Sequence, residues 1–231
     1  MTVSYDAVLF DLDGVLTSTA SLHAACWKAV FDEVLADCAR RTGDAQEPFD
    51  AERDYLAHVD GKAREDGVRD FLDARGVRDY DVNAIAERKQ ALVEDALARE
   101  GVMAFPGSVQ WVEYLRSAGV RTAVVSSSAN CDEVLRAAGI AGLFELTVDG
   151  RDVASLGLRG KPAPDGFLEA ARRLGVAPHR AVVVEDALAG VAAGRAGDFG
   201  VVIGVARSAK RADLRAAGAH LVVEDLGDLL P

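Results

Sequence analysis

Apolar and polar positions along the 231-residue chain follow two patterns, one typical of buried strands and one of helices. Residues 7–10 form a short, continuous apolar run, as expected of a strand that is covered on both faces. From there to residue 99 the apolar positions recur at helical spacing, and no further strand is predicted. The helices expected in this part span residues 19–35, 64–74 and 82–99, with a polar loop or insert at 37–50.

Beyond the segment FPGS, short apolar runs alternate with helical patterns. This alternation predicts an α/β fold with a doubly wound parallel sheet. The all-helical block is then an insertion, so we expect a core domain of residues 1–16 and 101–231 and a helical cap of residues 17–100. The expected strands span residues 120–128, 144–148, 180–186, 200–205 and 220–225, and the expected helices span 109–118, 131–138, 166–174, a glycine-rich stretch ending at 194, and 210–217.

The composition narrows the class of protein. Half of the residues are hydrophobic and 27% are charged, which is typical of a soluble globular protein with a sizeable core. The formal net charge of -11 argues against nucleic acid and against an anionic membrane as partners. It still allows a phosphorylated substrate, because a few cations and a metal ion can invert the field inside one cleft.

The cysteines and the N-terminal residues bear on where in the cell the protein is expected. The three cysteines are scattered and form no CxxC pair, so neither a disulfide framework nor a zinc site is indicated. The N-terminus has no signal-peptide pattern, and no apolar run is long enough to span a bilayer. We therefore expect a cytoplasmic protein, and we expect it to be a monomer.

Several charged and hydroxyl side chains fall at the carboxyl ends of the predicted strands or in the loops beyond them. In open α/β sheets the ligand crevice lies at these ends, so residues distant in the chain meet there. The set is Asp11, Asp13, Ser126, Lys161, Glu185 and Asp186.

The acidic members of this set allow more than one interpretation. Asp11 and Asp13 suit a turn or a helix N-cap. A calcium loop is excluded, because Val15, Leu16 and Leu22 stand where it needs an oxygen ligand, a glycine and a glutamate. The pair at 185–186 suits an N-cap or two oxygen ligands for Mg²⁺. Acids gathered in one cleft repel unless a cation joins them, which favours a metal site, although capping is compatible with it.

Lys161 and Ser126 complete a candidate phosphate site. Prolines stiffen the GKPAPD segment, and a lysine fixed near carboxylates suits neutralisation of a phosphoryl group. Ser126 is not in a GxSxG nucleophile elbow, and a strand-end serine followed by free backbone N–H groups suits a phosphate cradle. Capping of the next helix is the alternative for Ser128 and Asn130. The glycine-rich stretch 189–197 predicts close packing of a helix on the sheet.

The segments DLDGVLT, VVSSS, GKPAP and VVVEDALAG resemble, in order, the motifs of the haloacid dehalogenase superfamily. The helical insertion resembles the helical cap of that family. The resemblance implies that Asp11 is the nucleophile and Asp13 the general acid/base. It also implies that Ser126 and Lys161 hold the transferring phosphoryl group. Mg²⁺ would be held by Asp11, the main-chain carbonyl of Asp13, Glu185 and Asp186.

Within the superfamily, DLDGVLTSTASLHAACWKAV, GKAREDGVRDFL and ERKQ resemble the β-phosphoglucomutase branch. Three positions depart from that branch: Ser18 replaces an acidic residue, Ala129 replaces a lysine, and Lys62 replaces a small or apolar residue. Lys62 is a candidate to compensate for the lysine that Ala129 replaces. The implied substrate contacts are His23, Trp27, Gly61, Lys62, Arg64, Lys89, Ser127, Ser128 and Asn130, although His23 and Trp27 also suit simple packing.

The implied reaction is Mg²⁺-dependent phosphoryl transfer through an aspartyl phosphate, converting β-D-glucose 1-phosphate to glucose 6-phosphate. Arg64 and Lys89 favour such a mutase, because a second phosphate needs a second cationic site. The alternative is a phosphatase acting on a small phosphorylated metabolite or sugar phosphate. A phospho-accepting receiver domain is disfavoured, because no aspartate ends the strand at 120–128, and a binding protein without catalysis is disfavoured because no motif member is missing.

Overall fold

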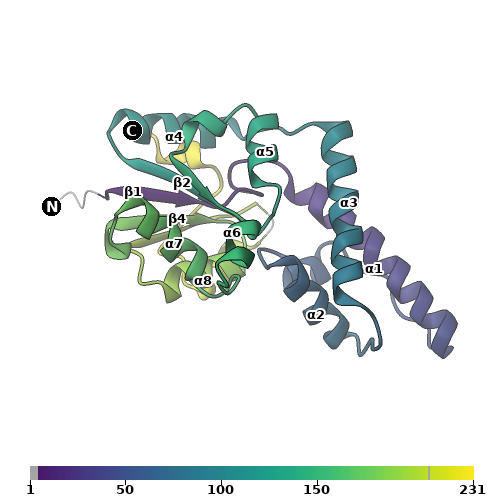
Figure 1. Cartoon of the computed structure of the whole chain (residues 1–231). Helices are drawn as coiled ribbons and strands as arrows, with labels where there is room; N and C mark the ends of the chain where they lie inside the picture. The colour runs from purple at the N-terminus through teal and green to yellow at the C-terminus, as the bar shows by residue number, and fades with distance from the viewer. Residues whose placement is uncertain (1–4, 208) are drawn as a thin grey trace.

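A parallel β-sheet of six strands forms the centre of the molecule (Figure 1). The computed structural model describes residues 5–207 and 209–231, so residues 1–4 and 208 of the predicted core segments lie outside the described part. The strand order is β3-β2-β1-β4-β5-β6, and every neighbouring pair is parallel. The predicted doubly wound α/β fold is therefore confirmed. The strands are β1 (Ala7–Phe10), β2 (Arg121–Val125), β3 (Leu146–Val148), β4 (Ala181–Glu185), β5 (Val201–Val205) and β6 (Leu221–Val223).

Helices cover both faces of the sheet, which explains why its strands are largely apolar. Alternate residues of β1 point to opposite faces, so Leu9 packs in one hydrophobic cluster and Phe10 in the other. The first cluster includes residues of α7, α8 and α9, and the second includes residues of α4 and α5. The helices of this part are α4 (Pro106–Ser117), α5 (Cys131–Ala137), α6 (Gly150–Ser155), α7 (Asp165–Leu174), α8 (Leu188–Ala196) and α9 (Arg211–Ala217).

The chain between β1 and α4 is helical and packs around a core of its own, to one side of the sheet (Figure 1). Its centre is an aromatic cluster in which the Phe31 ring lies 5.0 Å from Trp27 and 4.1 Å from Phe71, measured between centroids. No strand occurs within residues 20–100 of the described chain. The elements are α1 (Ala20–Thr42), a π-helical turn (Tyr55–Val59), α2 (Arg64–Ala74) and α3 (Val82–Glu100).

Two connections join this helical insertion to the sheet, and they run side by side. Thr17 and Ala104 form an antiparallel bridge. The amide of Ser18 donates to the Met103 carbonyl at 3.0 Å. The amide of Phe105 donates to the Leu16 carbonyl at 2.9 Å. The outgoing and returning chains are thus tied together by backbone hydrogen bonds.

The predicted loop at 37–50 is wrong over its first part, because α1 continues to Thr42. Its last turns are polar since they are largely exposed to solvent, and polar residues are compatible with an exposed helix end. Gly43 then ends the helix with a left-handed φ of 82°. The π-helical turn and α6 were not predicted, because both are too short to show a helical period.

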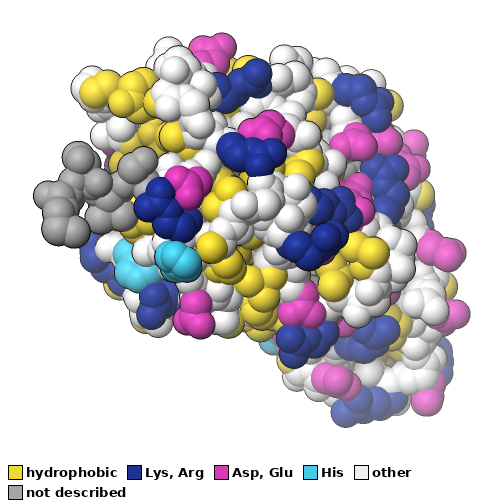
Figure 2. All heavy atoms as spheres, turned by 60° about the vertical axis from the view of Figure 1, so that its left-hand side comes forward, with side chains coloured by type: hydrophobic (Ala, Val, Ile, Leu, Met, Phe, Trp, Pro, Cys, Tyr) yellow, Lys and Arg dark blue, Asp and Glu magenta, His cyan; other side chains and the backbone are white. Residues whose placement is uncertain are grey.

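Charged side chains of both signs are interspersed on the face of the molecule that Figure 2 shows, among white and yellow groups. Ion pairs between exposed side chains of the chain include Arg180 with Asp6, at 2.5 Å, and Arg121 with Glu145, at 2.7 Å. None of the helices within residues 5–207 and 209–231 combines the length and apolarity needed to cross a membrane.

We predict that Phe31→Ala lowers the free energy of unfolding by about 3–5 kcal/mol, because a fully buried ring is lost and a cavity remains. Guanidinium unfolding followed by tryptophan fluorescence measures this, since Trp27 stacks on Phe31. Leu156→Ala is the control, because Leu156 is half exposed and should change stability by no more than about 0.5 kcal/mol. A loss for Phe31→Ala no larger than for this control would contradict the importance of the aromatic cluster.

Candidate active site

The carboxyl ends of three adjacent strands bring the predicted side chains together. β1 lies between β2 and β4, so Asp11, Ser126 and Glu185, which follow or end these strands, become neighbours. The amide of Asp11 continues the ladder by donating to the Val184 carbonyl at 2.9 Å. Parallel pairing therefore fixes the spacing of these groups before any side-chain contact is made.

Lys161 lies at the centre of the site and is buried. Its Nζ donates to Asp11 Oδ1 at 2.5 Å, to Glu185 Oε1 at 2.6 Å and to the Val125 carbonyl at 3.2 Å. Burial alone would lower the pKa of Lys161, but the two carboxylates hold it above its usual value. Burial raises the pKa of Asp11 to about 6 and that of Glu185 to about 7, against the opposing effect of the lysine.

The site holds more acidic side chains than the buried cation at its centre, Lys161, can neutralise. Asp11, Glu185 and Asp186 each offer a carboxylate oxygen, and these oxygens lie within 4.8 Å of one another. The pKa of Asp186 is raised well above its usual value, first by burial and then by neighbouring carboxylates. One ammonium leaves negative charge uncompensated here, so the cluster fits a divalent cation that prefers oxygen ligands.

Two glycines provide the space that these carboxylates occupy. A Cβ on Gly14, whose φ is +83°, would lie 1.9 Å from Asp186 Oδ2. A Cβ on Gly190 would lie 1.7 Å from Glu185 Oε1. The expected close packing of the glycine-rich helix is seen at Gly194, where a Cβ would lie 3.0 Å from Val202. Gly190 adds a second role, because it gives room to an acidic side chain of the site.

Asp13 has different surroundings from Asp11. Its Oδ1 accepts a hydrogen bond from Thr19, which was not predicted as a site residue, and lies 3.5 Å from His23 Nε2. Burial raises the pKa of Asp13 above its usual value, although the Thr19 hydroxyl opposes the shift. A partly buried carboxyl with a raised pKa can hold a proton, which suits acid/base chemistry.

His23, Trp27 and Lys89 contact one another beside Asp13. Lys89 Nζ lies 2.7 Å from His23 Nδ1 and 4.9 Å from the centroid of the Trp27 ring. A lysine ammonium can only donate, so Nδ1 accepts and the neutral imidazole carries its hydrogen on Nε2, toward Asp13. Burial lowers the pKa of Lys89 to about 8 and holds that of His23 well below its usual value.

The loop that begins at Gly61 joins the insertion to the core. The Ser127 hydroxyl donates to the Gly61 carbonyl at 2.8 Å. Lys62 lines the cavity and pairs with Asp70 of α2. Arg64 Nη1 donates to Gln90 Oε1 at 2.8 Å.

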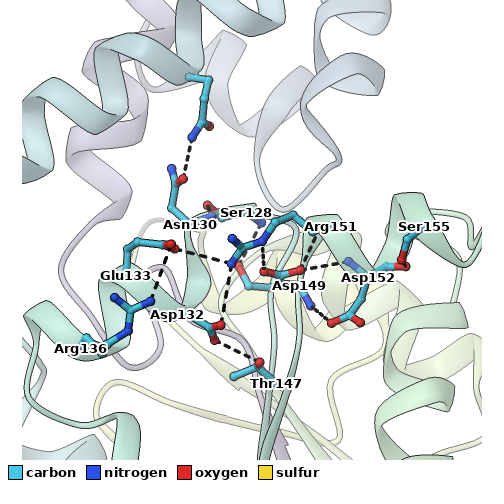
Figure 3. A network of polar contacts seen from close by, with 12 residues as sticks. Ser128, Asn130, Asp132, Glu133, Arg136, Thr147, Asp149, Arg151, Asp152 and Ser155 are labelled. Carbon is cyan, nitrogen blue, oxygen red and sulfur yellow. Dashed lines mark hydrogen bonds and ion pairs between the residues drawn. The ribbon is translucent and has the colours of Figure 1, made fainter.

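The core side of this junction is a polar network around Ser128 and Asn130 (Figure 3). Gln90 Nε2 donates to Asn130 Oδ1 at 2.6 Å, whereas the buried Asn130 Nδ2 has no hydrogen-bond partner in the described part of the chain. The Asn130 amide donates to the Ser128 hydroxyl at 3.2 Å, so the serine serves the turn before α5. Arg151, which was not predicted, lines the same hollow as Ala129 and pairs with Asp149 at 2.9 Å.

A cavity between the insertion and the sheet edge collects most of the predicted residues. Lys161 and Glu185 are not among the residues that line it, but Lys161 contacts both Asp11, which does line it, and Glu185. Asn130 lines a neighbouring hollow. The predicted residues that line the cavity are Asp11, Asp13, His23, Trp27, Gly61, Lys62, Arg64, Lys89, Ser126, Ser127, Ser128 and Asp186.

Tyr55 and Asp60 also line this cavity, and both were missed. Burial, followed by the charge of Glu185, raises the pKa of Asp60 to about 7, while the Tyr55 hydroxyl lowers it through a hydrogen bond. Neither residue belongs to a recognisable motif. The one sequence signal for Asp60 is its place immediately before GKAREDGVRDFL, the segment that resembles the β-phosphoglucomutase branch.

Comparison with known proteins identifies relatives with named activities. Residues 5–198 match the haloacid dehalogenase-like hydrolase family. The β-phosphoglucomutase of Mycobacterium bovis is 48% identical over 238 residues, which covers 97% of this chain and 91% of that protein. Hexitol phosphatase A of Escherichia coli is 36% identical over 197 residues, which covers 84% of this chain and 80% of that protein.

A solved structure shares the fold. The crystal structure of β-phosphoglucomutase from Clostridium difficile matches with a TM-score of 0.76 at 24% identity. The match covers 98% of this chain and 93% of that one. The sheet topology, the acidic cluster at its edge and these matches agree, and the chain therefore belongs to the haloacid dehalogenase-like hydrolase family, a family of enzymes.

Proposed function

We propose that the protein is a β-phosphoglucomutase, which converts β-D-glucose 1-phosphate to glucose 6-phosphate by phosphoryl transfer. The observation that carries the proposal is the arrangement of Asp11, Lys161 and the 185–186 acids below a cavity that the helical insertion closes. The 48% identity to a named β-phosphoglucomutase over nearly the whole chain supports the substrate.

The acidic cluster would hold Mg²⁺ through Asp11, the Asp13 main-chain carbonyl, Glu185 and Asp186. The bound ion supplies positive charge that stabilises the phosphoryl oxygens as they pass through the transition state. Lys161 adds a fixed ammonium, and Ser126, at the end of β2, would hold the phosphoryl group from the other side. These groups position the phosphorus, and positioning with electrostatic stabilisation provides most of the catalysis in phosphoryl transfer.

Asp11 and Asp13 have separate tasks in the proposed mechanism. A carboxylate oxygen of Asp11 attacks the phosphorus in line, so an aspartyl phosphate forms as the bond to the leaving oxygen breaks. Asp13 donates a proton to that leaving oxygen. Because Oδ1 of Asp13 accepts from Thr19 and faces His23, the proton belongs on Oδ2.

The mutase needs the transfer in both directions. In one half-reaction the 6-hydroxyl of glucose 1-phosphate attacks phosphorylated Asp11 while Asp13 takes its proton, and glucose 1,6-bisphosphate results. In the other, Asp11 takes the phosphoryl group from position 1 while Asp13 returns the proton to that oxygen. We propose that residues 17–100 act as a cap that closes over the sugar and excludes water, with Arg64 facing the second phosphate.

A phosphatase is the second candidate. Ala129 leaves the serine loop without a cation, and Lys62 is paired with Asp70, so fewer positive groups face a second phosphate. The hexitol phosphatase relative supports this alternative. In it, water rather than a sugar hydroxyl attacks phosphorylated Asp11.

We predict that the protein incubated with β-glucose 1-phosphate, Mg²⁺ and a trace of glucose 1,6-bisphosphate forms glucose 6-phosphate, measured with a coupled dehydrogenase. Asp11→Asn is the matched control and should form none while keeping its fold by circular dichroism, because an amide is a poor nucleophile. Release of free phosphate without glucose 6-phosphate would contradict the mutase and support the phosphatase.

Asp13→Asn should separate proton transfer from binding. Turnover should fall by about 10²–10⁴-fold, because the amide cannot donate the proton. Affinity for Mg²⁺ and for inorganic phosphate, measured by calorimetry, should be preserved, because the proposed metal contact is the main-chain carbonyl. Unchanged turnover would show that Asp13 has a different role. Loss of Mg²⁺ binding together with loss of turnover would show the same.

Gly190→Ala should weaken Mg²⁺ binding by about 10–100-fold, because the new methyl group displaces the Glu185 carboxylate. Alanine is a better helix former than glycine, so unfolding of α8 would not explain a loss. Gly142→Ala is the control, since a Cβ there meets no atom within 4 Å. Equal Mg²⁺ affinity of the two variants in calorimetry would exclude this role for Gly190.

A further inference from the structure

Asp60 brings an additional carboxyl to the cavity from the helical insertion. It follows the π-helical turn Tyr55–Val59 directly, and its amide donates to the Tyr55 carbonyl at 3.0 Å. Tyr55 is buried beside it and lines the same cavity. The main chain of Asp60 is therefore held by the turn that precedes it.

The next residue fixes the position of this carboxyl relative to the core. The Ser127 hydroxyl holds the Gly61 carbonyl at 2.8 Å. A Cβ on Gly61 would lie 2.7 Å from the Ala187 Cβ, so the loop touches the core there. With Gly61 held between the serine loop and the residue after Asp186, Asp60 has little freedom to move away from the site.

Among the described residues, no cationic side chain forms an ion pair with Asp60. The nearby groups that act on it electrostatically include Glu185 and Asp13, which repel it, and Lys161, which attracts it. The three N–H groups of Lys161 already donate to Asp11, Glu185 and the Val125 carbonyl. Within the described residues, Asp60 is also not a member of the cluster whose oxygens lie within 4.8 Å. A structural ion pair and direct metal ligation therefore do not explain it.

The direction of the reaction indicates what lies against Asp60. In an in-line displacement the leaving oxygen points away from the attacking one. Asp11 attacks from the core, so the sugar must extend toward the insertion, where Asp60 lines the cavity. A carboxylate repels phosphate oxygens but accepts hydrogen bonds strongly, and a sugar presents hydroxyl donors.

We propose that Asp60 is a substrate-recognition residue that accepts a hydrogen bond from a sugar hydroxyl, and that it selects polyol phosphates over phosphates without hydroxyls. The inference rests on the proposed phosphoryl transfer. This role explains why a carboxylate lies where neighbouring carboxylates repel it. The negative charge of Asp60 weakens the binding of simple anions, and it strengthens a hydrogen bond donated by a hydroxyl.

The test compares Asp60→Ala with the wild type on β-glucose 1-phosphate and on acetyl phosphate, which has no hydroxyl. The ratio of kcat/KM for the sugar phosphate to that for acetyl phosphate should fall at least about ten-fold, because a charged hydrogen bond is lost. The value for acetyl phosphate should stay equal or rise. Asp73→Asn, on an exposed part of α2, is the matched control and should leave the ratio within about two-fold.

An unchanged ratio would overturn the proposal, and so would equal losses on both substrates, which would assign Asp60 to the transfer step itself. Calorimetry with Mg²⁺ and inorganic phosphate provides a further check, since weaker Mg²⁺ binding in Asp60→Ala would assign it to the metal. If the wild type transfers phosphate from neither substrate, the proposed function fails. Binding then decides about Asp60, because the variant should lose affinity for glucose 6-phosphate and not for inorganic phosphate.

Discussion

The buried ammonium of Lys161, between Asp11 and Glu185, is the interaction on which the rest of the site depends. Burying this many carboxylates is unfavourable unless positive charge accompanies them, and hydrogen bonds of 2.5 and 2.6 Å provide it in part. The sheet supplies the positions, because β1 and β4 are parallel neighbours that end together. Gly14 and Gly190 supply the room. The negative charge that remains uncompensated makes the cluster suited to a divalent metal ion.

The core of the fold and the site floor could be predicted because their residues follow directly from strand ends. A polar residue follows each of two apolar runs: Asp11 follows residues 7–10, and Glu185 follows residues 181–184. Once these runs are recognised as parallel strands, both polar residues are expected at the same edge of the sheet. Asp60 could not be predicted in this way. Its position depends on a π-helical turn and on the contact of Gly61 with Ser127 and Ala187, which are tertiary facts with no local pattern.

The side chains predicted to contact a sugar phosphate show a related limit. His23, Trp27 and Lys89 do line the cavity, yet the lysine already contacts the other two. The resemblance gives residue types and cannot show which polar atoms are committed to one another. Lys89 Nζ contacts His23 Nδ1, and His23 Nε2 in turn lies 3.5 Å from Asp13 Oδ1, so these three side chains follow one another along the cavity wall.

The paired connections at Thr17 and Ala104 have a mechanical consequence. A domain that is connected by one flexible segment can rotate about many axes. Two connecting segments that are hydrogen-bonded to each other restrict rotation mainly to one axis. The turn beside these connections also holds Asp13, because the Gly14 amide donates to the Thr17 carbonyl at 2.8 Å and Asp13 is bridged to Thr17. One continuous set of backbone contacts therefore links the base of the insertion to the loop in which Asp13 lies.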